Sequence, residues 1–280
     1  QISSQYFDHL NEYLTSFVGG GIMFLWINQQ GTSPETAALL SNQNFRQALN
    51  YGFDRSATVN AVNPGYKAYN RLVDSNFAGP GGGKFVDEYP VETAPLSGDV
   101  DQAKEYLAAA MEELGYSDVS QLPQLELITW DTSEQKLLLK TIIDQWKQNL
   151  GLENIQLTQY VIGTAIGSFY DLSYDLFSIT WETDVLPTDI MEAMVTGGEV
   201  NYGIWSDAQF DALVEQAINE LDPDKQAELT AQAEQIFLDN EAILPLYENG
   251  VTGAVQSYVE GFQMSATSSG YQFNNLVVHK

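Results

Sequence analysis

The chain has 280 residues, of which 44% are apolar and 12% aromatic, enough to bury one large core or two modest ones. Acidic residues outnumber basic ones by 38 to 11, and the formal net charge of -27 disfavours nucleic acid and anionic lipid headgroups as partners. Cysteine is absent, which excludes disulfides, a thiolate nucleophile and a cysteine zinc site. We therefore expect a globular protein that suits neutral or cationic ligands.

The first third of the chain predicts a strand, a helix and a long irregular segment. An apolar run between glycines indicates a buried strand at residues 20–28. Apolar side chains then recur at helical spacing from Phe45 to Phe53, which predicts a helix with one inward face. Proline and glycine dominate residues 62–98, and irregular segments of this length are often functional or surface excursions.

The middle of the chain predicts a helix followed by a βαβ unit. Asp99 is suited to cap a helix that ends at Gly115, because a carboxylate binds unpaired N–H groups and glycine tolerates a left-handed conformation. A strand at 125–130, a helix starting near Thr132 and an alternating strand at 155–161 then follow. A strand, helix and strand in about 35 residues predict parallel strands with a right-handed crossover.

Two further helices are predicted close together near the carboxyl end. Ser206 and Gln209 have the spacing of a capping box, and Asp222 with Pro223 is a typical N-cap and first helical residue. We expect an antiparallel helical hairpin over residues 206–239. Apolar and polar residues alternate at 251–258 and 273–279, which predicts terminal strands.

Motifs for catalysis, metals and nucleotides are not found in the sequence. The two histidines, His9 and His279, lie at opposite ends of the chain, and no cofactor or metal site is expected. The glycine-rich stretch 79–84 lacks two required residues of a phosphate-binding loop. Two carboxylate pairs leave a glycoside hydrolase open as an alternative, namely Glu182 with Asp184 and Asp171 with Asp175.

Four segments together resemble a known family. They are Asn44-Phe45-Arg46-Gln47-Ala48-Leu49-Asn50-Tyr51-Gly52-Phe53-Asp54-Arg55, Trp181-Glu182-Thr183-Asp184, the stretch 201–214 that begins Asn201-Tyr202-Gly203-Ile204-Trp205, and Ile243-Leu244-Pro245-Leu246-Tyr247. This order resembles the carboxyl-terminal half of the oligopeptide-binding proteins that serve ABC importers. The resemblance covers essentially the whole chain and is strongest from Phe177 to Tyr247.

The resemblance implies roles for individual residues. In the family a W-x-x-D segment lies at the ligand cleft, so Trp181 is expected to wall the pocket and Asp184 to accept hydrogen bonds from the α-ammonium of a peptide. Tyr202, Gly203 and Trp205 match a loop that lines the cleft, although core packing explains Trp205 equally well. The R-x-A-L-x-x-x-x-D-R helix motif identifies the family, and its charged residues are expected to be scaffold.

The resemblance also implies an architecture, an α/β lobe with a mixed sheet flanked by helices. Residues 22–245 are expected to form the second lobe of a two-lobed protein. Residues 1–21 are then a segment close to the hinge, and residues 246–280 return to a first lobe that is mostly missing. A hinge between the lobes would close them around the ligand.

We therefore expect a monomeric, non-enzymatic solute-binding protein that captures oligopeptides and docks on the permease subunits of an ABC importer. Its expected location is extracellular, as a lipoprotein anchored at the cell membrane through an absent N-terminal region, or periplasmic. Within the binding class, an oligosaccharide ligand is the alternative, because stacked Trp and Tyr rings also suit sugars. A signalling or adhesion module would instead use a surface patch without enclosing a small ligand.

Overall fold

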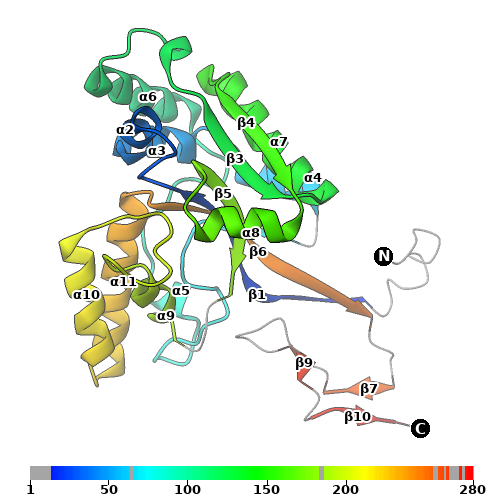
Figure 1. The fold of residues 1–280 in the computed structure, drawn as a ribbon. Coiled ribbons are helices and arrows are strands. Elements are labelled where there is room, and N and C mark those ends of the chain that lie inside the picture. Colours follow the sequence, from blue (N-terminus) through cyan, green and yellow to red (C-terminus); the bar gives the residue numbers. More distant parts are fainter. Residues whose placement is uncertain are drawn as a thin grey trace.

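The computed structural model describes residues 14–63, 66–182, 186–254, 258–261, 263–264, 271–272 and 275–279. A six-stranded sheet crosses the molecule with helices on both faces, in the strand order β2-β6-β1-β5-β3-β4 (Figure 1). The strands of this sheet are β1 (Leu14–Ile27), β2 (Lys67–Ala68), β3 (Leu125–Trp130), β4 (Ile155–Tyr160), β5 (Leu176–Trp181) and β6 (Ile243–Ala254). Four two-residue strands near the carboxyl end form two separate pairs, which are β7 (Val259–Glu260) with β10 (Val277–Val278) and β8 (Gln263–Met264) with β9 (Tyr271–Gln272).

The sheet is mixed, as the sequence predicts. Strand β3 pairs in parallel with β4 and β5, whereas β1 pairs antiparallel with β5 and β6. The βαβ unit is confirmed as β3, α7 (Ser133–Leu150) and β4. Thr132 caps α7 by accepting from the Gln135 N–H, and Gly151 ends it in the left-handed conformation.

The other helices follow in chain order. They are α2 (Pro34–Ser41), α3 (Gln43–Tyr51), α4 (Arg55–Val62), α5 (Phe85–Glu88), α6 (Val100–Leu114), α8 (Ile162–Tyr170), α9 (Asp189–Ala193), α10 (Ala208–Asn219) and α11 (Pro223–Asp239). The predicted caps Asp99 of α6 and Asp222 of α11 are confirmed. Within the described ranges, no helix combines the length and apolarity needed to cross a bilayer.

Two sequence predictions about helix bounds need correction. Helix α10 is capped by Asp207, whose carboxylate accepts from the Gln209 and Phe210 N–H groups, while the Ser206 hydroxyl bonds Thr196 instead. The helix predicted from the spacing of Phe45 to Phe53 is α3, whose start is fixed by the Asn42 side chain accepting from the Phe45 N–H; it ends at Tyr51, so Phe53 lies beyond it. The predicted strands at 251–258 and 273–279 are only partly described, by the end of β6 and by β10.

Strand β1 separates two apolar cores. Its residues Ile22, Phe24 and Trp26 belong to one core, and the alternate residues Met23, Leu25 and Ile27 belong to the other. This division follows from the two-residue period of a strand, which sends successive side chains to opposite faces. We call the core that contains Met23 the first core, which α3, α6 and α7 cover, and the core that contains Phe24 the second core, which α8, α10 and α11 cover.

The irregular segment between α4 and α6 is held in place by buried carboxylates. Glu234 of α11 bonds the Arg71 guanidinium at 2.5 Å and accepts from the Leu72 N–H at 2.9 Å. Glu248 of β6 accepts from the N–H of Ser75 at 2.6 Å and from its hydroxyl at 2.8 Å. Because buried carboxylates are normally hydrogen-bonded, each of these two fixes the chain that supplies its donors.

The glycine-rich stretch that resembles a phosphate-binding loop holds an anion of its own chain. The N–H groups of Gly81 and Gly83 donate to the two carboxylate oxygens of Glu88, at 2.9 and 2.6 Å. Successive backbone N–H groups commonly form such concave anion sites. Here the anion is the side chain of α5, so the loop is closed onto the following helix.

Replacing Trp146 with Ala tests the first core. The Trp146 side chain is 0% exposed, packs edge to face on Phe53 and donates to the Leu49 carbonyl at 2.7 Å. We expect Trp146→Ala to lower the free energy of unfolding by about 3–5 kcal/mol in urea titrations, because truncation leaves a cavity and an unpaired carbonyl. Leu137→Ala on the same helix, where the side chain is 47% exposed, should cost less than about 1 kcal/mol. Equal losses would contradict this account of the core.

Candidate functional site

Aromatic side chains gather where β5 ends. The ring of Trp181, the last residue of β5, lies 6.0 Å from the ring of Trp26, measured between centroids. The Tyr202 ring lies 4.6 Å from Phe169 and 5.3 Å from Tyr170. Trp26 and Phe169 are buried, Trp181 and Tyr202 are half-buried, and Tyr170 is 55% exposed. We call these five residues the aromatic wall; its buried rings support others that remain partly accessible to solvent.

The elements around the wall explain its geometry. Trp26 comes from β1 in the centre of the sheet, and β1 places Ile22 opposite Trp181. Helix α8, which follows β4, supplies Phe169 and Tyr170. The buried Tyr174 hydroxyl donates to the Tyr202 carbonyl at 2.6 Å and fixes the loop. Burial raises the pKa of the Tyr202 hydroxyl, so it is a neutral hydrogen-bonding group at physiological pH.

One buried amide organises the loop 201–205. The Asn201 side chain donates to the carbonyls of Met194, Val195 and Trp205 and accepts from the Trp205 N–H at 3.1 Å. Gly203 passes close to the sheet, since a Cβ atom there would lie 3.1 Å from the Ile27 carbonyl oxygen. Its own carbonyl accepts from the Gln29 N–H at 2.9 Å. The loop is therefore tied both to itself and to the end of β1.

The predicted ligand residues are brought together only in part. Trp181 and Tyr202 share the aromatic wall, and Gly203 follows directly behind Tyr202. Trp205 is 5% exposed and packs between Phe210 and Phe237, so core packing accounts for its side chain. Asp184 lies outside the described residues. Ligand contact by each of these residues stays a prediction.

The remaining members of the wall have no distinctive sequence signal. Trp26 sits in an apolar run that reads as a plain buried strand, and Phe169 and Tyr170 lie in a helix without a motif. Yet the Trp26 Nε1–H is buried without a hydrogen-bond partner among the described residues. Buried donors are usually satisfied, so an unpaired one at the base of the wall marks it as unusual.

Of the two carboxylate pairs that suggest a glycosidase, Asp171 with Asp175 lies within the described residues, whereas Asp184 of the other pair does not. Asp175 is buried and accepts from both the N–H and the hydroxyl of Thr32, at 2.9 and 2.8 Å. Its other oxygen accepts from the Glu126 N–H at 3.0 Å. Asp171 is exposed at the end of α8. Because the acid and base of a glycosidase must both reach the substrate, this pair does not form a hydrolytic site.

The comparisons with known proteins agree with this fold. Residues 2–202 match the family described as bacterial extracellular solute-binding proteins, family 5 Middle. The oligopeptide-binding protein OppA of Bacillus subtilis is 28% identical over 83% of this chain and 42% of its own length. The dipeptide-binding protein DppE of the same organism is 26% identical over 74% of this chain and 37% of its own length. The chain thus spans about two fifths of the length of these relatives.

Solved structures have the same fold. The substrate-binding domain of an oligopeptide ABC transporter from Bacillus anthracis has a TM-score of 0.82 and 22% identity, over 99% of this chain and 53% of that chain. OppA of Listeria monocytogenes bound to peptide has a TM-score of 0.79 and 22% identity, with the same coverage. The α/β fold with a mixed sheet is therefore shared with one half of these chains.

Replacing Asn201 with Ala tests how the loop under Tyr202 is held. The change leaves three carbonyls and one N–H without the Asn201 side chain. We expect the free energy of unfolding to fall by about 2 kcal/mol, because buried polar groups lose their partners. The matched variant Asn219→Ala removes one exposed bond to the Glu215 carbonyl and should stay within about 0.5 kcal/mol of the wild type. Similar losses for both variants in urea titrations would show that the loop does not depend on Asn201.

Proposed function

The chain belongs to the bacterial extracellular solute-binding proteins of family 5, and from this membership we propose that it captures oligopeptides for an ABC importer. OppA and DppE of Bacillus subtilis are named as oligopeptide- and dipeptide-binding proteins. The observation that carries the proposal to this chain is the aromatic wall, which stands at the end of β5 where the W-x-x-D segment begins. A wall of this kind holds peptide side chains by area and ring contacts without reading their identity.

We propose that residues 22–245 form the second lobe, with residues 1–21 close to the hinge and residues 246–280 returning to the first lobe. Pairing in the sheet supports this division. Strands β1 and β6 pair from Leu14 with Ala254 to Trp26 with Ile243, but β5 joins β1 only from Ile22 onward. The outer halves of β1 and β6 therefore project from the sheet as a two-stranded ribbon (Figure 1). This ribbon would connect the lobes.

In the proposed complex the peptide lies between the lobes. Asp184 would accept hydrogen bonds from the peptide's α-ammonium, and Trp181 and Tyr202 would contact the first side chains. Gly203 and Trp205 would support the loop that carries Tyr202. Closure of the lobes would exclude water, and in a drier site a charged hydrogen bond between ammonium and carboxylate is stronger.

The wider role follows from the same proposal. The protein would act outside the cytoplasmic membrane, as an anchored lipoprotein or in a periplasm, and would deliver its ligand as a monomer to the permease subunits of the importer. We expect no hydrolysis, and the hydrogen bonds that Asp175 accepts from the backbone and from Thr32 support this for the pair Asp171 with Asp175. Nucleic acid is not an expected partner, given the net charge of -27.

An oligosaccharide is the second candidate ligand, and the exposed Tyr170 ring beside Tyr202 is the observation that favours it. Flat rings suit sugar faces as well as peptide side chains. Mass spectrometry of ligands retained during native purification distinguishes the two. We expect peptides; retained sugars in place of peptides would overturn the oligopeptide assignment while leaving the family membership unaffected.

Replacing Asp184 with Asn tests the proposed anchor for the peptide ammonium. The change keeps the shape of the side chain and removes its charge, which is worth about 1.5–3 kcal/mol in a charge-assisted hydrogen bond. Peptide affinity of the full-length two-lobed protein, measured by calorimetry, should fall about ten- to a hundredfold; the second lobe alone is expected to bind peptide poorly, because it leaves one side of the ligand in water. Acetylating the amino group of the peptide should weaken binding to the wild type by a similar factor and add little to the effect of the variant.

Glu182→Gln is the matched control, because Glu182 is an exposed carboxylate two residues away. It should leave peptide affinity within about twofold of the wild type, which corresponds to less than about 0.5 kcal/mol. Equal loss in both variants would indicate a general effect of negative charge. An unchanged affinity in Asp184→Asn, together with equal binding of free and acetylated peptide, would show that Asp184 is not the anchor.

A further inference from the structure

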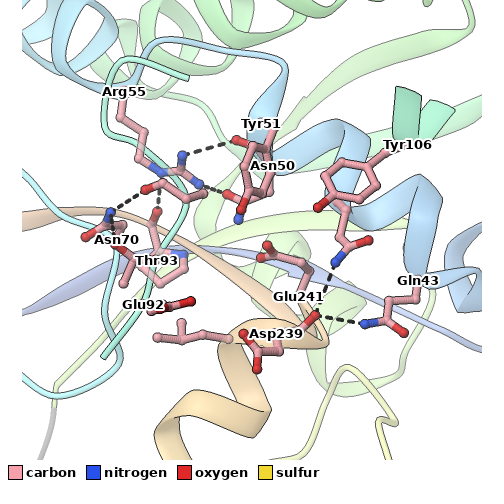
Figure 2. A pocket seen from close by; sticks show the side chains of 14 residues that line it. Gln43, Asn50, Tyr51, Arg55, Asn70, Glu92, Thr93, Tyr106, Asp239 and Glu241 are labelled. Carbon is pink, nitrogen blue, oxygen red and sulfur yellow. Dashed lines mark hydrogen bonds between the residues drawn. The ribbon is translucent and has the colours of Figure 1, made fainter. Parts of the chain in front are cut away.

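A concave site lies away from the aromatic wall. It is a pocket of about 260 Å³ between α3, α6, the segment 92–94 and the junction of α11 with β6 (Figure 2). Its rings, Tyr51 and Tyr106, pack against the first core, whereas Trp181 and Tyr202 of the wall pack against the second core. The pocket shares no lining residue with the aromatic wall, and the peptide proposal does not account for it.

The floor of the pocket holds a buried carboxylate without an ion-pair partner. Glu241 is 5% exposed, and among the described residues no Lys, Arg or His nitrogen lies within 4.0 Å of its carboxylate. The Asn50 side chain does form a hydrogen bond with it. Carboxylates are rarely buried without a cation, because desolvation of the charge is costly.

The two nearest guanidinium groups are bonded to other oxygens. Arg46 donates to the Leu40 carbonyl at 2.9 Å and to the Asn240 carbonyl at 2.8 Å. Arg55 donates to the Pro245 carbonyl at 2.9 Å and to both oxygens of Asn50. The positions of both guanidinium groups are thus set by the backbone carbonyls that they bind. Their positive charges offset part of the effect of burial on the pKa of Glu241, but neither guanidinium group forms an ion pair with its carboxylate.

The rest of the lining favours a cation with an apolar body. Glu92 and Asp239 are exposed carboxylates that line the pocket together with Glu241, while Arg55 is the one cationic side chain among its lining residues. The Tyr51 and Tyr106 rings lie edge to face with centroids 5.4 Å apart on one side. Ring faces attract ammonium groups and pack against methylene chains.

We propose that this pocket binds a small aliphatic amine, with an ammonium group on the Glu241 carboxylate and the methylene chain against Tyr51 and Tyr106. A second ammonium group, where the ligand has one, would reach Glu92 and Asp239 at the rim. This binding would be separate from peptide capture and does not rest on it. The chemistry is that of an ion pair completed by the ligand, at a position where the protein itself supplies none.

The protonation state of Glu241 makes ligand binding at this site dependent on pH. Burial raises the pKa of Glu241 to about 8, and Asn50, Arg55 and Arg46 offset part of that effect while Asp239 adds to it. The remaining ionisable groups of the pocket are Tyr51 and Tyr106, whose pKa values burial also raises, and the exposed Glu92 at the rim. Below pH 8 the folded protein therefore holds a proton on Glu241 that an ammonium ligand must displace. Binding should release a proton and strengthen as pH rises.

The experiment is calorimetry with 1,4-diaminobutane as the probe and 1,4-butanediol as its uncharged counterpart. We expect the diamine to bind and the diol not to bind. Between pH 6 and pH 8 the affinity should rise roughly fiftyfold, because the ionised fraction of Glu241 rises from about 1% to about half. At pH 7, titrations in buffers of different ionisation enthalpy should show nearly one proton released per diamine bound.

Three variants make the test specific. Glu241→Gln should weaken diamine binding by at least about tenfold and abolish proton release. The exposed rim pair, changed together as Glu92→Gln and Asp239→Asn, should weaken it about three- to tenfold without disturbing the fold. Glu215→Gln, an exposed carboxylate of α10 outside this pocket, should have no effect.

Several outcomes would overturn the proposal. These are equal binding of diamine and diol, no proton release from the wild-type protein at pH 7, unchanged affinity in a folded Glu241→Gln variant, or equal weakening by Glu215→Gln, which would indicate general attraction to an acidic protein. If Glu241→Gln does not fold, the proposal is still tested by proton release from the wild type and by the diamine affinity of the Glu92 and Asp239 double variant.

Discussion

The structure depends on one strand that is buried on both faces. Strand β1 lies between β5 and β6, and its residues from Ile22 to Ile27 are almost inaccessible to solvent. A strand in this position must be apolar on both sides, which explains why its sequence is a continuous apolar run without alternation. Helices on either face pack against the same six residues. Both cores of the protein are therefore built on one shared strand.

Several segments without regular secondary structure are held in position by buried charged side chains that bind backbone atoms. Glu234 and Glu248 hold the segment that follows β2, Asp175 holds the turn after β1, and Arg46 with Arg55 holds chain ends around α3. Each group replaces the regular hydrogen bonds that a helix or strand would provide.

The sequence predicts best the features that depend on neighbouring residues. The caps of α6, α7 and α11 and the parallel pairing around α7 follow from short patterns, because capping and amphipathic spacing act within a few turns. Helix α2 escapes prediction, since its short segment has a weak apolar face. The aromatic wall and the Glu241 pocket join residues far apart in the chain, and only Trp181 and Tyr202 are indicated beforehand, through the family resemblance. The glycine loop around Glu88 shows the same limit, because its bound anion comes from the next helix.

The ribbon formed by the outer halves of β1 and β6 has a mechanical consequence. Anything joined at its far end is connected through two hydrogen-bonded strands, which resist stretching and sliding. Two-stranded ribbons nevertheless twist more readily than wide sheets, and a register shift adds local twist and bend. Such a shift lies between Val18 and Ile22, where Gly21 has φ of +102° and passes the Trp181 carbonyl too closely for a Cβ atom. Motion of the attached part would therefore be a twist about this point, next to Trp181 of the aromatic wall. The ribbon would resist the twist elastically and return the attached part to its starting orientation.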